Sequence, residues 1–181
     1  GDNIFQPARA FGSASVLNIR SNPPLFEQGK KFRGRASIKG GSFGFINPSI
    51  KLEGKISRKL SAVVSGEYMS SKGDYPFKQY YGNEKGDSVS THTRKNTDVE
   101  NFRIEGTLFG NFSEKEAAYL KAYYYQSERG LPGNVVLYNP DANTKQRQWD
   151  KTFLAQGNYT RDLSRLLSFQ TNAKYSWSWM R

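Results

Sequence analysis

The sequence predicts an all-β protein, an antiparallel up-and-down meander that forms part of a transmembrane β-barrel. Three observations lead to this fold class. Apolar and polar residues alternate along seven stretches, which is the period of a strand with two different faces. The connections are short at one end of the strands and long at the other, as in outer-membrane barrels. No stretch approaches the run of about 20 apolar residues that a membrane helix requires.

The composition agrees with strands that each have one polar face. Only 36% of the 181 residues are hydrophobic and the mean hydropathy is -0.76, yet the chain holds 12 Phe, 11 Tyr and 3 Trp. So many rings argue against a disordered chain. The lack of cysteine excludes disulfides and thiolate metal sites within the chain. The net charge of +11 suits nucleic acid, an anionic membrane surface or an anionic ligand, and a solvated basic surface explains it equally well.

Short turn signals separate the first three predicted strands. Residues 32–40, FRGRASIKG, alternate between an apolar side and a side of Arg, Ser and Lys, and GSFG then marks a turn. Residues 46–56 alternate again, although Pro48 cannot donate to a ladder and therefore requires a loop, an edge or a bulge nearby. After a turn at 57–59, the alternation continues over residues 60–68.

Four more strands complete the count of seven, at residues 102–112, 118–126, 149–160 and 167–179. The fifth of the seven strands has a helical alternative, because Ser113 and Glu116 match a capping box. The run of three tyrosines at 123–125 favours a strand instead.

Two connections are long, near 70–97 and near 126–148, and both are rich in turn-forming residues. Loops of this length are functional or disordered. From the second strand onward, the short turns all lie at one end of the meander and the two long loops at the other. The long loops are therefore the expected place for contacts with a ligand.

The apolar sides of the strands carry small or aliphatic residues in the middle and rings near the ends. No second run of strands is left to cover these sides, so lipid is the layer that the sequence predicts against them. Aromatic rings then belong at the two membrane interfaces, where a ring meets both hydrocarbon and water. The predicted interface rings are Tyr68, Phe102, Phe112, Tyr124, Tyr159, Tyr175, Trp177 and Trp179.

Several segments resemble TonB-dependent outer-membrane receptors of the vitamin B12 and siderophore branch. AFGSASVLNIRSNPP (10–24) resembles the end of their plug domain, although it lacks the usual Gly-Gly pair before a short strand. Residues 41–77 resemble their first barrel hairpins, and residues 101–133 resemble this branch in particular. GDYPF (73–77) and ERGLPG (128–133) are the most distinctive parts.

This resemblance implies a fragment of a plugged barrel of about 22 strands. Residues 1–24 are then the tail of the plug domain and its linker, and residues 25–181 are the first part of the barrel. The family imports a large scarce nutrient, such as cobalamin or a siderophore, across the outer membrane. It takes its energy from the inner membrane through a TonB-type periplasmic coupling protein, whose docking segment is absent from this chain. The resemblance thus implies a receptor in the cell outer membrane, surrounded by its lipid.

Rings and cations in the long loops suit a large, partly anionic ligand. The candidates for ligand contact are Tyr75, Phe77, Tyr80, Tyr81 and Arg94 in the first loop and Arg129, Tyr138 and Trp149 in the second. The alternative is that these side chains only pack the loops together. Four loop aspartates are possible calcium ligands without EF-hand spacing: Asp74, Asp87, Asp98 and Asp141. With His92 as the only histidine and no paired carboxylates on a strand face, the sequence predicts no enzyme, no cofactor and no metal site.

Two alternatives place the chain outside a membrane. A basic β-barrel that binds nucleic acid needs rings and cations on one face, whereas here they lie mostly on opposite faces. Lys121, between Tyr119 and Tyr123, is the exception. A soluble adhesive or structural β domain needs a second packed layer, which the sequence does not offer. We therefore expect no nucleic-acid partner, and we expect the open strand edges to pair with other strands or other copies.

Overall fold

The computed structural model describes residues 23–83, 86–132 and 146–181, and every regular element among them is a β-strand. The predicted plug tail at 1–24 lies almost wholly outside these residues. Seven strands form one antiparallel sheet in the order β1-β2-β3-β6-β7-β8-β9. The strands of this sheet are β1 (Phe32–Gly41), β2 (Phe45–Lys55), β3 (Leu60–Ser71), β6 (Val99–Ser113), β7 (Glu116–Gly130), β8 (Arg147–Asp162) and β9 (Ser168–Met180).

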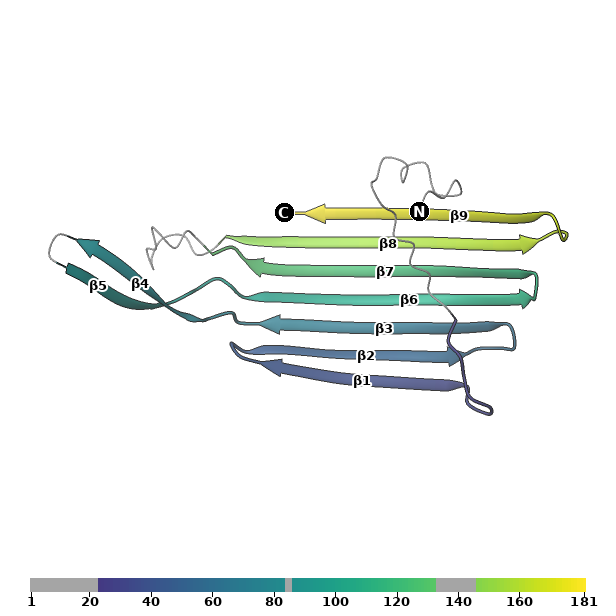
Figure 1. Ribbon diagram of the computed structural model, residues 1–181, viewed down its shortest axis with the longest axis horizontal. Coiled ribbons are helices and arrows are strands. Elements are labelled where there is room, and N and C mark those ends of the chain that lie inside the picture. Colours follow the sequence, from purple (N-terminus) through teal and green to yellow (C-terminus); the bar gives the residue numbers. More distant parts are fainter. Residues whose placement is uncertain (1–22, 84–85, 133–145) are drawn as a thin grey trace.

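The main sheet confirms the predicted all-β antiparallel meander. Each strand of the sheet pairs with the next one along the chain, apart from the step from β3 to β6. β1 and β9 are the two edges and do not pair with each other, so the sheet is open in the described part of the chain (Figure 1). An open sheet agrees with the expectation that this chain does not close a barrel by itself.

The first long loop was predicted incorrectly in part, because it contains two further strands. β4 (Pro76–Asn83) and β5 (Gly86–Thr93) pair as an antiparallel hairpin. Figure 1 shows this hairpin extending beyond one end of the main sheet, which we call the hairpin end. The second long connection leaves the sheet at the same end, and the turns β2–β3, β6–β7 and β8–β9 lie at the opposite, short-turn end.

Strands β6, β7 and β8 are longer than predicted. β7 continues to Gly130 and β8 begins at Arg147, so the second long connection is shorter than the predicted 126–148. Outside the apolar region both faces of a strand are polar, and the alternation that marks a strand in the sequence disappears. The helix considered after Glu116 is wrong, because that residue begins β7.

A serine side chain stabilises each of the three turns at the short-turn end. The hydroxyl of Ser57 accepts hydrogen bonds from the amides of Lys59 (3.2 Å) and Leu60 (3.1 Å). Ser164 accepts from the amides two and three residues further along at the same two distances. Ser113 accepts from the Lys115 amide at 3.2 Å. The capping-box signal at Ser113 therefore belongs to a hairpin turn, since a serine hydroxyl satisfies free amides in turns as well as at helix starts.

The register places the alternating residues of all seven strands on two common faces. Ala36 lies opposite Ile50, Ile50 opposite Gly66, Gly66 opposite Ile104, and Ile104 opposite Tyr124. Because directly opposite residues of an antiparallel pair share a face, these five lie on one side of the sheet, which we call the apolar face.

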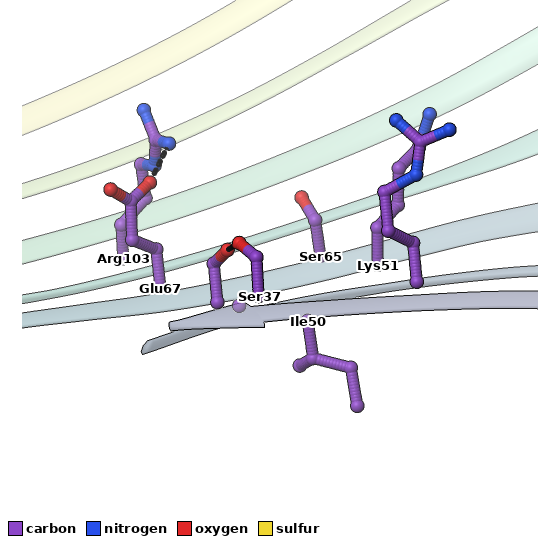
Figure 2. A pocket seen from close by; sticks show the side chains of 9 residues that line it. Ser37, Ile50, Lys51, Ser65, Glu67 and Arg103 are labelled. Carbon is purple, nitrogen blue, oxygen red and sulfur yellow. Dashed lines mark hydrogen bonds and ion pairs between the residues drawn. The ribbon is translucent and has the colours of Figure 1, made fainter. Parts of the chain in front are cut away.

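The other side, the polar face, carries charged and hydroxyl groups. Figure 2 shows Ile50 on one side of the sheet and Ser37, Lys51 and Glu67 on the other. Several side chains of the polar face are buried, since Asn47, Glu53, Thr107 and Ser127 are each at most 7% exposed. Phe109, the only buried hydrophobic side chain among the described residues, also lies on the polar face, beside the ring of Tyr119.

The apolar face has no protein layer over it in the described structure. Its exposed large side chains include Ile38, Ile50, Leu52, Val64, Ile104, Leu108, Leu120, Phe169, Tyr175 and Trp177. A soluble protein buries most of its large apolar side chains, whereas this sheet leaves many of those on its apolar face exposed and buries several polar side chains instead. None of the described residues forms a helix long and apolar enough to cross a membrane.

Candidate functional site

The rings of the apolar face form rows near both ends of the strands. Toward the hairpin end, Tyr68 lies opposite Phe102. Trp177 lies opposite Phe153, which in turn lies opposite Tyr124. The row between Tyr68 and Trp179 also includes a cation, Lys151, whose Nζ lies 5.6 Å from the centroid of the Trp179 ring.

A second group of rings lies toward the short-turn end. Tyr159 and Phe169 contact each other, with ring centroids 6.3 Å apart. The ring of Phe112 lies over Gly110, where a Cβ would meet it at 2.7 Å. Phe112 therefore covers backbone that the glycine leaves bare, as aromatic residues do for strand glycines elsewhere.

The middle of the apolar face holds small or aliphatic residues, as predicted. One row is Val64, Gly106, Ala122 and Ala155, and the next is Ala62, Leu108, Leu120, Gly157 and Ala173. Tyr175 belongs to the first of these rows, one row nearer the middle than Trp177. From Tyr68 to Leu60 is eight residues of strand, or about 27 Å at the usual rise. A tilt of about 40° shortens this to about 20 Å, close to the height of a barrel's apolar band.

Ion pairs connect neighbouring strands across the polar face, and sequence analysis did not find them. Arg33 pairs with Glu53, and Arg103 with Glu67. The Nζ of Lys121 lies 3.0 Å from Glu105. A shallow hollow on this face is lined by side chains that include Ser37, Ser49, Ser65, Lys51, Glu67 and Arg103 (Figure 2). The partners of these ion pairs lie up to 36 residues apart in the sequence. Predicting them requires the register of the strands, which alternation alone does not give.

The candidates from the first loop lie on the hairpin or at its base. Tyr75 contacts the ring of Phe43 in the β1–β2 turn, with centroids 6.1 Å apart. Phe77 lies against His92, with centroids 5.8 Å apart. Tyr80 is 71% exposed on the other side of the hairpin from Phe77. Tyr75 and Phe77 thus each contact another ring of the protein, although Tyr75 is still 41% exposed, and Tyr80 is more open to solvent.

Two further candidates of the first loop differ in what the structure says of them. Arg94 is only 7% exposed, and its backbone amide donates to the Tyr75 carbonyl at 2.9 Å. Its side chain is therefore part of the folded hairpin base, and it is not presented to solvent. Tyr81 lies in β4 at a position whose side chain is outside the described part of the structure.

Two of the second-loop candidates, Arg129 and Trp149, lie on opposite faces of the sheet. Arg129 lies in β7 on the polar face, 3.4 Å from Asp150, and its Nε donates to Gln148 at 3.3 Å. Trp149 lies in β8 on the apolar face, opposite Glu128. Placing Arg129 and Trp149 in a loop was therefore incorrect, and Trp149 belongs with the rings of the apolar face. Tyr138 lies outside the described residues.

Segment 95–98 joins the two long connections at the hairpin end. The side-chain amide of Asn96 donates to the carbonyl oxygens of Leu131 (2.9 Å) and Gln146 (2.8 Å), on both limbs of the β7–β8 connection. The hydroxyl of Thr97 donates to the carbonyl oxygen of Gly73 at 2.7 Å, just after β3. Asn96 has a positive φ of 59°, a conformation that asparagine tolerates better than most residues.

Two glycines allow this close approach. A Cβ on Gly73 would overlap the carbonyl group of Thr97, and a Cβ on Gly130 would overlap that of Asn96. Gly73 also has a φ of +65°. These are the glycines of GDYPF and ERGLPG, so the distinctive motifs of the sequence have a structural explanation. We call Asn96, Thr97, Asp98, Gly73, Gly130 and Arg147 the stem clamp.

Arg147 adds an electrostatic part to the stem clamp. Its guanidinium lies 2.6 Å from Asp98 and 2.5 Å from Glu128. The hydrogen bond from Arg147 is the main reason that the pKa of Asp98 lies below its usual range, and it outweighs the opposite effect of burial. Asp98 was a possible calcium ligand from the sequence. In the described part of the chain it faces an arginine, and no group of three or more His, Cys, Asp or Glu residues is arranged to hold a metal ion.

The polar face also bears on the nucleic-acid alternative. Tyr119 and Tyr123 share this face with Lys121, as a surface that stacks bases requires. Lys121, however, is paired with Glu105, and Arg103 with Glu67. The cations beside these rings therefore already have carboxylate partners within the sheet.

No protein-family model matches the chain, and no curated protein matches it with significant similarity. The family resemblance therefore remains a hypothesis from the residues quoted above. The functional argument depends on the faces of the sheet and on its hairpin end.

Proposed function

We propose that this chain is a section of the wall of an outer-membrane β-barrel receptor of the TonB-dependent type. The supporting observation is the inverted pattern of the sheet, with an uncovered apolar face and ion pairs on the opposite face. On this proposal lipid covers the apolar face, and the aromatic rows lie at its two interfaces. The polar face borders the lumen, and the missing strands of the barrel continue from β1 and β9.

The receptor captures a large, partly anionic nutrient such as cobalamin or a ferric siderophore. The support for this step is the distribution of connections, since hairpin β4–β5 and the β7–β8 connection lie at one end of the sheet. Long extracellular loops and short periplasmic turns are the rule in bacterial barrels. The hairpin end is therefore the extracellular end, and Tyr80 and Arg129 are its exposed ring and cation. Import is driven through a TonB-type coupling protein that binds a part of the receptor outside this chain.

The proposal has two parts, and two experiments test them separately. The lipid-facing part predicts that the purified chain partitions into detergent micelles or liposomes. A monodisperse monomer in plain buffer that unfolds cooperatively would disprove it. The receptor part predicts that deleting the gene reduces uptake of labelled cyanocobalamin or of a ferric siderophore. Unchanged uptake of all such nutrients, with the protein present in the outer membrane of the parent strain, would refute that part alone.

A further inference from the structure

Segment 95–98, which follows hairpin β4–β5, contacts the β7–β8 connection directly, although 35 residues separate Asn96 from Leu131. Asn96 lies between β5 and β6, and its single side-chain amide reaches both limbs of the β7–β8 connection. The Leu131 amide donates to Gln146 at 2.9 Å, which brings these limbs together at the point that Asn96 reaches. The Gly130 amide donates to the Asp98 carbonyl at 2.9 Å, a second link between the same two segments.

The contacts continue toward β1. Thr97 binds the Gly73 carbonyl, and the Gly73 amide donates to the Phe43 carbonyl at 3.3 Å. The Lys72 amide donates to the same carbonyl of Phe43 at 3.0 Å, and Tyr75 packs on the Phe43 ring. An unbroken series of contacts therefore runs from the β1–β2 turn, past the base of the hairpin, to the β7–β8 connection.

We infer that Asn96 is a positioning residue, which holds the base of the hairpin and the stem of the β7–β8 connection, at Leu131 and Gln146, as one unit at the hairpin end. Three features of Asn96 make this role specific. Its left-handed backbone turns the chain toward Gly130, its two amide hydrogens satisfy two carbonyl oxygens at once, and Gly130 leaves the space that its carbonyl group fills. An ordinary loop contact involves one limb, whereas this contact fixes both limbs relative to the hairpin.

The part that this coupling plays in ligand capture depends on the proposed function, but the coupling itself does not. In a receptor, a ligand that contacts the hairpin would meet the β7–β8 stem in a fixed position. Less conformational entropy is then lost on binding, because the two contact surfaces are already oriented. Affinity is expected to fall when the stem clamp is opened, even where no contact residue is changed.

A distance measurement in the complete protein tests the inference. This chain has no cysteine, so Lys78→Cys in β4 and Pro132→Cys after β7 provide two spin-label sites at exposed positions. Wild type is expected to give a narrow distance distribution. Asn96→Asp, which replaces both amide donors by a carboxylate facing two carbonyl oxygens, is expected to broaden it about twofold. Exchange of the Leu131 amide should become about tenfold faster, as expected for one or two lost hydrogen bonds.

Two further variants keep the test decisive. Asn96→Gly retains the left-handed backbone but lacks the amide, and it carries the test if Asn96→Asp does not fold. Asn101→Ala is the control, because this asparagine lies in β6 and its side-chain amide donates to the Met69 sulfur, at 3.9 Å, away from the β7–β8 connection. A wild-type distribution in Asn96→Gly would overturn the inference, and so would equal broadening in Asn101→Ala. Thermal unfolding of Asn96→Gly should match that of the control, which separates positioning from overall stability.

Ligand binding is measured on the same variants with cyanocobalamin and a ferric hydroxamate as probes. A probe that binds wild type is expected to bind Asn96→Gly about tenfold more weakly. Equal affinity despite a broadened distribution would overturn the positioning role. If neither probe binds wild type, the choice of nutrient in the proposed function fails, while the distance measurement still decides the coupling.

Discussion

The carbonyl group of Asn96 occupies the space that a Cβ on Gly130 would need. The Gly130 amide at the same time donates to Asp98, so the end of β7 is held against segment 95–98 over two residues. Gly73 has the same relationship to Thr97. The two long connections therefore meet where Gly130 permits backbone to approach backbone, and Gly73 permits the same approach between the two ends of the first connection.

Alanine at Gly130 is expected to open the stem clamp. The new methyl group overlaps backbone, which does not move aside as a flexible side chain does, so local stability should fall by about 1–3 kcal/mol. Gly73→Ala should lower local stability by at least as much, because Gly73 has a positive φ in addition to the close backbone contact. Hydrogen exchange at the Gly130 and Leu131 amides measures the change. Gly106→Ala is the matched control, since a Cβ there has no neighbour within 4 Å, and equal effects at Gly106 and Gly130 would contradict the explanation.

Acid should weaken the stem clamp. The pKa of Asp98 is lowered in the folded protein, mainly by its hydrogen bond from Arg147. A carboxyl group whose pKa is lowered by folding stabilises the folded state, and this contribution is complete at a pH above the pKa of the unfolded chain, about 3.9 for Asp. The contribution is lost as the pH falls through the pKa of the folded state. We therefore expect a spin label at Gln146→Cys to gain mobility only below about pH 4.

Asp98→Asn is the control for the acid effect. It should show the higher mobility already at neutral pH and lose the dependence on acid. The change should be small and should shrink with salt, because the Asp98 side chain is 40% exposed. An acid transition that persists unchanged in Asp98→Asn would assign the effect to another group.

Arginine should be tolerated on one face of the sheet only. Leu120 is 59% exposed in the middle of the apolar face, and Ser176 is exposed on the polar face. If lipid covers the apolar face, Leu120→Arg should reduce folding stability in liposomes by about 2–4 kcal/mol, the cost of arginine near the midplane. Ser176→Arg should change it by less than about 1 kcal/mol, since it faces the polar side. Urea titration in liposomes measures both, and equal costs would argue against a lipid-covered face.

The sequence predicted the strands and their faces where one face is apolar. From Leu60 to Tyr68 every second residue faces the apolar side, and the observed pairing with β6 preserves this alternation. Hairpin β4–β5 was predicted as a loop because it has no consistently apolar face. Tyr80 faces Val89 on one side, but Lys78 and Thr91 follow on the same side. A hairpin with polar residues on both faces lacks the alternation of apolar and polar residues on which strand prediction depends.

The candidate site was less predictable, because contacts between distant segments require the register and the path of the connections. Asn96 gave only a weak signal, as one asparagine in a polar stretch. Gly73 and Gly130 gave a better one, since each lies in a motif that already stood out. The interaction of Arg147 with Asp98 spans 49 residues and follows from no local pattern.

Arg129→Ala should weaken ligand capture without preventing assembly. Arg129 lies at the hairpin end of the polar face, with Gln148 and Asp150 holding its guanidinium. A contact from this cation to an anionic ligand is worth about 1.5–3 kcal/mol, so uptake affinity should fall roughly tenfold or more. Tyr81→Ala should act in the same direction. Arg165→Ala, in the turn at the opposite end, is the control, and wild-type uptake in the Arg129→Ala, Tyr81→Ala double variant would exclude both residues.

The open edges of β1 and β9 should make the isolated chain associate with itself. In the described part of the chain neither edge has a further strand beside it. Each edge therefore presents unpaired backbone N–H and C=O groups, which cost several kcal/mol apiece in hydrocarbon and recruit other strands. A single cysteine at Ser37 in β1 or Ser176 in β9 should therefore cross-link two copies in micelles with a short bismaleimide. Ser65→Cys should not, because β3 is paired on both sides with β2 and β6. In the complete protein the edges meet the remaining strands, and cross-linking between copies should disappear. Cross-linking within one copy of a Ser37→Cys, Ser176→Cys variant of the isolated chain would instead mean that β1 and β9 close on each other, and the open sheet would then be wrong.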